Sequence, residues 1–193
     1  MDVGRSLTMV VIRQADLAGA DASAVGAAAR EYLRQTEQEK AERGLSPSLA
    51  GDALLPRSYQ DEVDDPRKAY EGCRVLVAEV DHEVVGVVVV KPHGEGAEIK
   101  RLWAAPHLRG RGISSALLDA AIAEHSGTDV LRLSVWDWRT GAIRLYESRG
   151  VRAGAVVGRA RPIALFPALG VDGSTGIGSA VLTRESGVGR SQP

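Results

Sequence analysis

The sequence predicts an α/β protein with a mixed, mostly antiparallel central sheet of about six to seven strands flanked by helices. Two patterns predict this class. Short β-branched runs joined by tight turns alternate with stretches of helical period. One strand is followed by a glycine-rich turn, a helix and another strand, an order that makes those two strands parallel. The chain has 193 residues, 44% hydrophobic and 25% charged, which is typical of one soluble domain.

The N-terminal part predicts a strand and a long helix. Met9–Ile12 is a β-branched run. Asp21 or Ser23 can cap the following helix through a side-chain oxygen. The helix is expected to end near Arg43, because Gly44 tolerates a left-handed conformation. Its apolar face is formed by Val25, Ala28, Ala29, Tyr32, Leu33 and Thr36.

The region from Leu45 to Gly72 lacks a periodic pattern, because prolines and a glycine interrupt it. They are Pro47, Gly51, Pro56 and Pro66. A short helix is expected over Ser58–Val63, within a segment that covers one end of the sheet. Its acidic residues predict a solvated face, with attraction of a cationic substrate as the alternative. They are Asp61, Glu62, Asp64 and Asp65.

The second half predicts most of the sheet. A hairpin turns at Asp81-His82, and the connection after the fourth strand changes to a glycine-rich turn and a helix. The expected strands are Arg74–Val80, Glu83–Val90, Ala97–Ala104, Leu131–Val135, Ala153–Arg161 and Ile177–Arg184, and the expected helices are Ile113–His125 and Thr140–Arg149. We expect a single domain over residues 1–193, with frayed tails at 1–7 and 186–193.

Composition argues against several partners. The formal net charge of −1 gives no overall attraction for nucleic acid. No stretch approaches the roughly 18 apolar residues of a membrane span, and Met1–Ser6 lacks the core of a signal peptide, so the expected location is cytoplasmic.

The single cysteine, Cys73, is expected to be a small buried side chain. His93 and His107 lack metal-ligand spacing, so no metal is expected.

The segment Arg109–Ser114 carries the clearest chemical signal. It places Gly110 and Gly112 between a predicted strand and a predicted helix. Glycine lets backbone approach a ligand closely, and a helix N-terminus attracts phosphate through its free N–H groups and its dipole. Arg109 and Arg111 add positive charge. The segment therefore predicts a phosphate cradle; the alternative is a tight turn that needs glycine for its geometry alone.

Two other phosphate-binding patterns fail here. A P-loop requires Lys followed by Ser or Thr after its last glycine, whereas Ile113 and Ser114 follow Gly112. A dinucleotide fingerprint requires a third glycine, which this segment lacks.

The stretch Ala97–Val151 resembles the GNAT superfamily of N-acetyltransferases, which move an acetyl group from acetyl-CoA to an amine. The family's Arg/Gln-x-x-Gly-x-Gly/Ala signature is similar to Arg109–Ser114, with Ser114 in place of Gly or Ala. Its tyrosine helix is similar to Ala142–Val151. Arg139 stands where many members have Asn. The resemblance implies the GNAT fold, with splayed fourth and fifth strands around a cofactor slot.

The resemblance also implies where acetyl-CoA binds and which groups act. Glu98 is similar to the catalytic glutamate of the family's histone acetyltransferases, which implies a general base that takes the amine proton. Tyr146 is similar to the tyrosine that protonates the departing thiolate. The implied cofactor contacts are the main chain of Leu102, Trp103 and Ala104 and the cradle residues Arg109, Gly110, Arg111, Gly112, Ile113 and Ser114.

Each role has an alternative. The base can instead be Glu79 or Asp137, or the reaction can proceed without a protein base. In these cases Glu98 is simply a polar residue at a strand end. Tyr146 can instead be a packing residue. The three tryptophans near the expected strand split can line an acceptor pocket or belong to the core; they are Trp103, Trp136 and Trp138.

The expected activity is acetylation of a small-molecule amine. One alternative is a non-catalytic CoA-binding or sensory module, and another is an acyltransferase that acts on a protein N-terminus or lysine. The sequence does not specify the acceptor, the length of the acyl chain or whether the protein forms a homodimer.

Overall fold

The computed structural model describes residues 9–46, 55–94, 96–125, 130–150, 152–154 and 179–185. The expected tails at 1–7 and 186–193, and most of the strand expected at 153–161, lie outside these residues. The helices are α1 Ala22–Ala41, α2 Arg57–Asp64, α3 Pro66–Ala69, α4 Ile113–Glu124 and α5 Thr140–Glu147, with a 3-10 turn η1 at Pro106–Leu108. The strands are β1 Val11–Gln14, β2 Arg74–Val80, β3 Glu83–His93, β4 Gly96–Ala104, β5 Val130–Trp136, β6 Arg152–Gly154 and β7 Ser179–Glu185.

The strands form a mixed sheet in the order β1-β2-β3-β4-β5-β7-β6. β1 and β2 are antiparallel, and β7 pairs antiparallel with both β5 and β6. β4 and β5 are parallel, with Glu98 opposite Arg132. The strand–helix–strand pattern therefore predicted the direction of β5 correctly, since a crossover helix returns the chain to the same end of the sheet.

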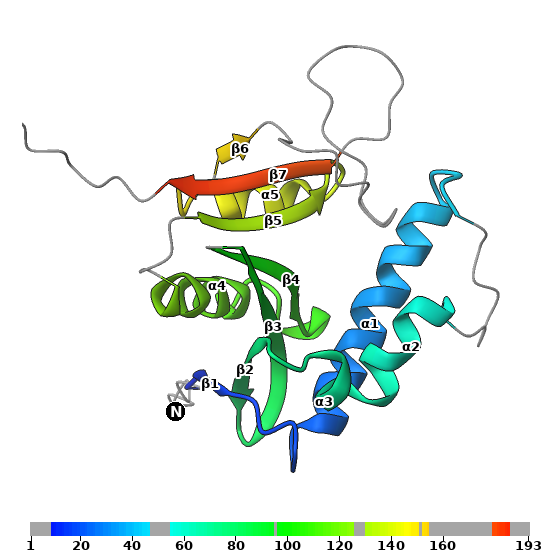
Figure 1. Cartoon of the computed structure of the whole chain (residues 1–193), viewed down its shortest axis with the longest axis vertical. Coiled ribbons are helices and arrows are strands. Elements are labelled where there is room, and N and C mark those ends of the chain that lie inside the picture. Colours follow the sequence, from blue (N-terminus) through cyan, green and yellow to red (C-terminus); the bar gives the residue numbers. More distant parts are fainter. Residues whose placement is uncertain are drawn as a thin grey trace, which may run out of the picture. The chain divides into compact units, whose positions relative to one another are not determined.

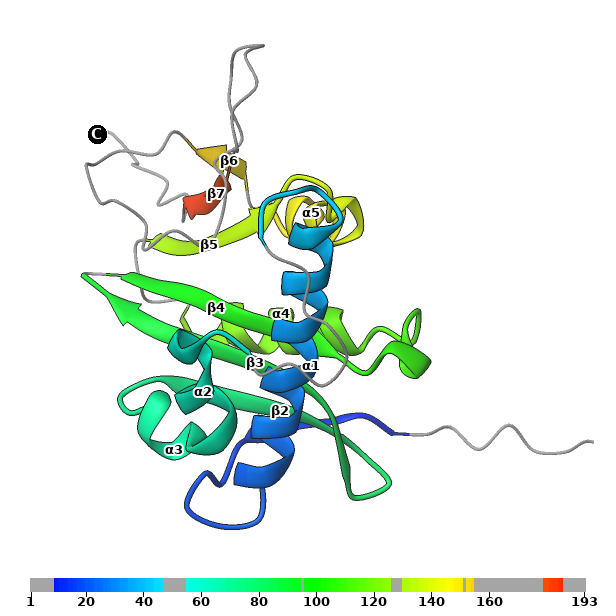
Figure 2. The same cartoon turned by 90° about the vertical axis from the view of Figure 1, so that its right-hand side faces the viewer.

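The chain divides into two compact units, and each is described by itself. The first unit contains Met1–Val89 and Arg101–Ala121, and the second contains Val90–Lys100 and Ile122–Pro193. Within the first unit, α1, α2 and α3 lie on one face of β2 and β3, and α4 lies on the opposite face (Figure 1, Figure 2). β1 is short and joins the edge of β2.

A valine-rich core holds α1 on the strands of the first unit. Its buried members are Val25, Ala28, Tyr70, Val75, Val77, Val87 and Val89. Cys73 and Trp103 pack against this cluster at its margin. Cys73 is half-buried, whereas the sequence predicted a buried side chain. Burial of each valine in this cluster contributes about 1.5–3 kcal/mol.

Gly86 on β3 determines how closely α4 approaches the opposite face. A Cβ at this position would lie 2.8 Å from Ile113 Cγ2 and 2.9 Å from Leu117 Cδ1. Because glycine leaves that space free, the first turn of α4 packs directly on the sheet. The position of the α4 N-terminus is therefore set by rigid packing.

The start of α1 differs from the expected side-chain cap. Asp21 occupies the N-cap position, but its carboxylate makes no capping hydrogen bond. It accepts instead from Arg13, at 2.6 Å, and from the backbone N–H of Asp16, at 2.7 Å. The hydrogen bonds from Arg13 lower the pKa of Asp21. The helix start was predicted correctly, but the role of the carboxylate was not, because its partner Arg13 lies on β1.

The acidic region also differs in part from a solvated face. Asp61, Asp64 and Asp65 are exposed as expected, and Asp65 caps α3 by accepting from the backbone N–H of Lys68 at 3.1 Å. Pro66 occupies the first turn of this unexpected helix, where a missing N–H costs nothing. Glu62 turns inward, and the cluster that it joins is described below.

Candidate active site

The glycine-rich segment forms an exposed loop that enters α4. Gly110 and Gly112 both have a φ of +79°, a left-handed conformation that favours glycine. A Cβ added at either position would meet no atom within 4 Å. The glycines are therefore required here by backbone conformation, and the space beside them is open.

The first turn of α4 supplies hydrogen-bond donors to that space. Ala116 donates to the Gly112 carbonyl at 2.9 Å, which is the first bond of the helix. The N–H groups of Ile113, Ser114 and Ser115 precede it and have no carbonyl one turn back to bond with. These donors, together with the positive end of the helix dipole, fit a phosphate group.

The two arginines of the loop are both exposed. One Arg109 guanidinium nitrogen lies 3.4 Å from Gln35 Oε1 on α1. Arg111 adds a second positive charge beside the glycines. An open backbone cradle, free helix donors and two exposed cations together match the needs of a pyrophosphate, so the residues present fit the phosphate end of coenzyme A.

The expected pantetheine segment forms the end of β4. Leu102, Trp103 and Ala104 are all half-buried. The backbone N–H of Ala105, directly after this segment, donates to the Val85 carbonyl at 2.8 Å. This hydrogen bond holds the end of β4 on β3. The Trp103 side chain packs against the valine-rich core. The predicted cofactor contact of this residue therefore involves its main chain, and it stays a prediction.

The two residues expected to move protons belong to the second unit. Glu98 on β4 is half-buried, and one of its oxygens lies 3.4 Å from Lys100 Nζ. Tyr146 is a buried residue of α5, with 6% of its surface exposed. Neither position contradicts its expected role, and both roles stay predictions.

The tryptophans divide between the two units. Trp136 and Trp138, at the end of β5, stack with ring centroids 4.4 Å apart. Trp136 is buried and Trp138 is half-buried, which makes Trp136 a packing residue. Trp103 lies at a hollow in the first unit.

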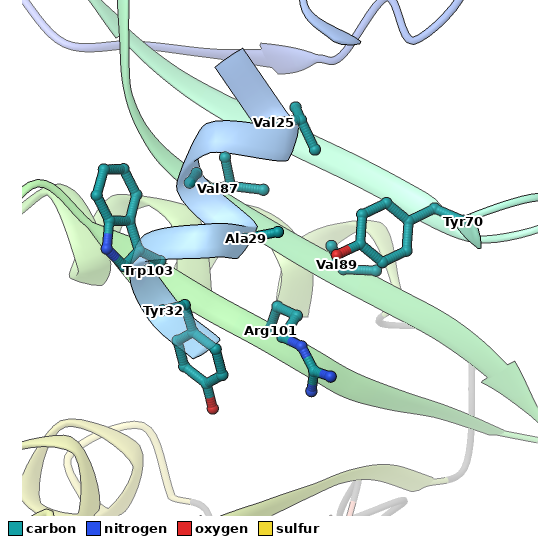
Figure 3. Close-up of a pocket in the computed structure, with 9 residues that line it drawn as sticks. Val25, Ala29, Tyr32, Tyr70, Val87, Val89, Arg101 and Trp103 are labelled. Atoms are coloured by element: carbon teal, nitrogen blue, oxygen red, sulfur yellow. The ribbon is translucent and has the colours of Figure 1, made fainter. Parts of the chain in front are cut away.

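That hollow lies under α1 and borders a cluster of charged and aromatic side chains (Figure 3). Arg101 and Tyr32 lie together near its polar end, and Trp103 and Tyr70 lie on opposite sides of it. Its cavity volume of about 10 Å³ has room for about one water molecule. The lining residues are Val25, Ala28, Ala29, Tyr32, Tyr70, Val87, Val89, Arg101 and Trp103.

A buried ion pair stands beside the hollow. Arg101 on β4 donates from Nε to Glu62 Oε2 at 2.9 Å and from a terminal nitrogen to Oε1 at 2.8 Å. The Tyr70 hydroxyl donates to the same Oε2 at 2.9 Å. The Arg101 guanidinium also lies 5.4 Å from the Tyr32 ring centre, within the range of a cation–π interaction.

These contacts set the protonation states. Burial lowers the pKa of Arg101, the charge of Glu62 raises it, and the net direction is upward. Burial raises the pKa of Tyr70. The guanidinium therefore stays charged and the phenol stays protonated, which keeps both as donors to Glu62 over the physiological pH range.

Arg101 is not among the site residues expected from the sequence, although the sequence carries a signal for it. Ala97, Ile99 and Arg101 are the buried positions of an alternating strand. A charged residue on the inward face of such a strand requires a buried partner. The identity of that partner, Glu62, depends on the fold, since 39 residues separate the two.

Within the described residues, no helix is long and apolar enough to cross a membrane. The same residues include no group of three or more His, Cys, Asp or Glu side chains placed to hold a metal ion.

Residues 31–151 match the sequence profile of the Acetyltransferase (GNAT) family. This chain belongs to the GNAT acetyltransferase family. The match covers β4, the glycine-rich loop, α4, β5 and α5. No curated protein matches the chain significantly in sequence.

Solved structures share the GNAT fold at low sequence identity. The PaiA N-acetyltransferase from Thermoplasma acidophilum, in complex with coenzyme A, has a TM-score of 0.63 at 18% identity and covers 92% of this chain and 99% of its own. Ribosomal-protein-alanine N-acetyltransferase from Brucella melitensis has a TM-score of 0.60 at 21% identity, covering 91% and 99%. A GNAT family acetyltransferase from Elizabethkingia anophelis with acetyl-CoA bound has a TM-score of 0.51 at 21% identity, covering 70% and 95%.

Proposed function

We propose that this GNAT acetyltransferase transfers the acetyl group of acetyl-CoA to the amine of a small molecule. The observation that supports it most is the loop at Arg109–Ser114, where two left-handed glycines and the first turn of α4 leave an open cradle for the pyrophosphate. When bound, acetyl-CoA supplies the acetyl group as an activated thioester. The main chain of Leu102–Ala104 holds the pantetheine arm in this proposal.

The remaining roles belong to proton transfer. An amine attacks only when its nitrogen lone pair is free, so a protein group or a water must take up its proton. Glu98 is the proposed base, acting through a carboxylate oxygen directly or through water. Tyr146 is the proposed acid, and its hydroxyl returns a proton to the departing sulfur.

Thiol release from acetyl-CoA measures the proposed activity directly. The protein is incubated with acetyl-CoA and a panel of small primary amines, with short peptides bearing a free N-terminus or lysine as a separate arm. Thiol release with a small amine, and a product heavier by one acetyl group in mass spectrometry, supports the proposal. Release with peptides alone would move the acceptor to a protein. Tight CoA binding without release in either arm would favour a non-catalytic CoA-binding module.

Two substitutions test the proton-transfer roles. For Tyr146→Phe we expect turnover to fall about 10- to 100-fold while CoA affinity in calorimetry changes less than about twofold. For Glu98→Gln we expect a similar loss of turnover and loss of the acidic limb of the pH–rate dependence, on which the rate rises as a single base loses its proton. Equal turnover in either variant removes that residue from the mechanism.

A further inference from the structure

The glycine-rich loop has a side-chain contact with α1, although 74 residues separate the two along the chain. A guanidinium nitrogen of Arg109 donates to Gln35 Oε1 at 3.4 Å, and both residues belong to the first unit. The other parts of the cradle are backbone, whose place is set by the loop conformation and by α4. Arg109 is a long, exposed side chain with many rotamers, so the place of its charge depends on a partner outside the loop.

A second contact determines how Gln35 presents its amide group. Gln35 Nε2 donates to Glu39 Oε1 at 2.7 Å, one helical turn further along α1. An amide carries its donor and its hydrogen-bond acceptor on opposite sides. The reversed orientation would set the amide oxygen against a carboxylate oxygen and the amide N–H groups against the guanidinium. Gln35 therefore offers Arg109 a hydrogen-bond acceptor in one orientation.

The packing of α1 keeps this acceptor in place. Gln35 is half-buried, and its neighbours Leu33 and Thr36 are 1% and 3% exposed. The amide is also uncharged, so it orients the guanidinium without cancelling its positive charge. A carboxylate at the same position would form an ion pair with Arg109 and compete with an incoming phosphate. The helix thus provides a fixed, neutral support for the first cation of the loop.

We infer that Gln35 is a positioning residue for coenzyme A, which acts by holding the Arg109 guanidinium for the pyrophosphate. This role rests on the proposed binding of the coenzyme at the loop. Ordering a long side chain on binding costs affinity, and a contact that restricts it beforehand removes part of that cost. A guanidinium has five N–H donors, so Arg109 can keep its contact with Gln35 through one and donate to phosphate oxygens through others.

A double-mutant cycle tests whether Gln35 acts through Arg109. Coenzyme A is titrated in calorimetry into wild type, Gln35→Met, Arg109→Met and the double variant. Methionine has a helix propensity close to that of glutamine and removes the hydrogen bonds. Gln38→Met is the matched control, because Gln38 Nε2 donates to Glu42 Oε1 at 3.2 Å in the same i,i+4 manner, without a hydrogen bond to any described residue of the loop.

We expect Gln35→Met to weaken the Kd of coenzyme A about threefold to tenfold, and Arg109→Met to weaken it at least as much. In the Arg109→Met background, Gln35→Met should have no further effect. Gln38→Met should leave the Kd unchanged. An unchanged or tighter Kd in Gln35→Met, an equal loss in Gln38→Met, or additive losses in the double variant overturns the positioning role. An unchanged Kd in Arg109→Met overturns it as well.

Steady-state kinetics give a readout that a merely structural role would not produce. With an amine that supports thiol release, the KM for acetyl-CoA of Gln35→Met should rise by about the same factor as the Kd, while kcat stays within about twofold. A fall in kcat at unchanged KM overturns the positioning role.

Thiol release also keeps this result separate from the proposed function. A Kd that depends on Gln35 through Arg109, without thiol release from any amine, supports the positioning role and argues against acetyl transfer. Thiol release together with an unchanged Kd in Gln35→Met supports acetyl transfer and overturns the positioning role.

Discussion

The glycine-rich loop and the Glu62–Arg101 cluster both belong to the first unit, yet they are built in opposite ways. The loop is six consecutive residues, Arg109–Ser114, with four exposed positions and open space beside its glycines. The cluster joins side chains from α1, α2 and β4 and the turn after α3, and it is buried and mostly hydrogen-bonded within itself.

The difference separates a site made from backbone from one made from side chains. Backbone donors at a helix N-terminus need no partner elsewhere in the chain, so the loop is ready for an anion as it stands. A buried charge needs its partner at a fixed place, so the cluster depends on the packing of α2 against α1 and β4. Substitutions in the two regions should therefore affect binding and stability separately.

The largest expected effect is on coenzyme A binding, from Gly112→Trp. The bulky side chain fills the open space beside the cradle, so we expect CoA affinity in calorimetry to fall by about 100-fold or more. Gly44→Trp is the matched control, because Gly44 also has a positive φ and open surroundings. Both variants should lose about 1–2 kcal/mol of stability from backbone strain. An unchanged CoA affinity in Gly112→Trp would refute the cradle.

Glu62→Gln should have the largest effect on stability. It leaves the Arg101 guanidinium buried without a counter-charge, and we expect a loss on the order of 3 kcal/mol in urea unfolding. Coenzyme A affinity should stay within about twofold of wild type. A double variant, Glu62→Leu with Arg101→Met, should recover most of the stability, because it removes both charges. A loss in the double variant as large as in Glu62→Gln would mean that packing, and not the unpaired charge, is responsible.

Gly26→Ala should have an intermediate effect, through the contact between α1 and α2. The new Cβ would lie 2.4 Å from the Val63 carbonyl oxygen, and backbone must shift to relieve it. We expect a loss of about 1–3 kcal/mol. Gly141→Ala in α5 is the control, since its Cβ meets nothing within 4 Å; its stability should be unchanged or higher by up to about 1 kcal/mol. Equal effects in the two variants would argue against close packing of α2.

The smallest expected effect is pH-dependent and concerns Asp21→Asn. The hydrogen bonds from Arg13 lower the pKa of Asp21 in the folded protein, so this carboxylate stabilises the fold above its unfolded pKa of about 3.9. That stabilisation is lost as the pH falls through the folded-state pKa. We expect wild type to exceed the variant by about 1 kcal/mol at pH 7, because Arg13 is partly exposed. The two unfolding curves should converge in acid; a difference independent of pH would exclude the ionic contribution.

Much of the fold could be predicted because its signals are local. The hairpin at Asp81-His82 has positive φ at both residues, and the long helix ends before Gly44, whose φ is +70°. The parallel direction of β5 followed from the order of its neighbours. The conformation of the loop was predicted for the same reason, since a strand, two glycines and a helix within one short segment specify it. Its phosphate binding stays a prediction.

The tertiary structure alone decided which partner each buried charge has. The sequence placed Glu62 on a solvated face and Asp21 at a helix cap, and the fold paired them with Arg101 and Arg13 instead. Side-chain partners separated along the chain are not specified by local pattern, because many carboxylates could satisfy one guanidinium. Packing selects among them by distance and by the cost of leaving a charge unpaired. The sequence by itself thus determined the glycine-rich loop and predicted its phosphate cradle, and only the fold showed that Glu62 of α2 pairs with the buried Arg101.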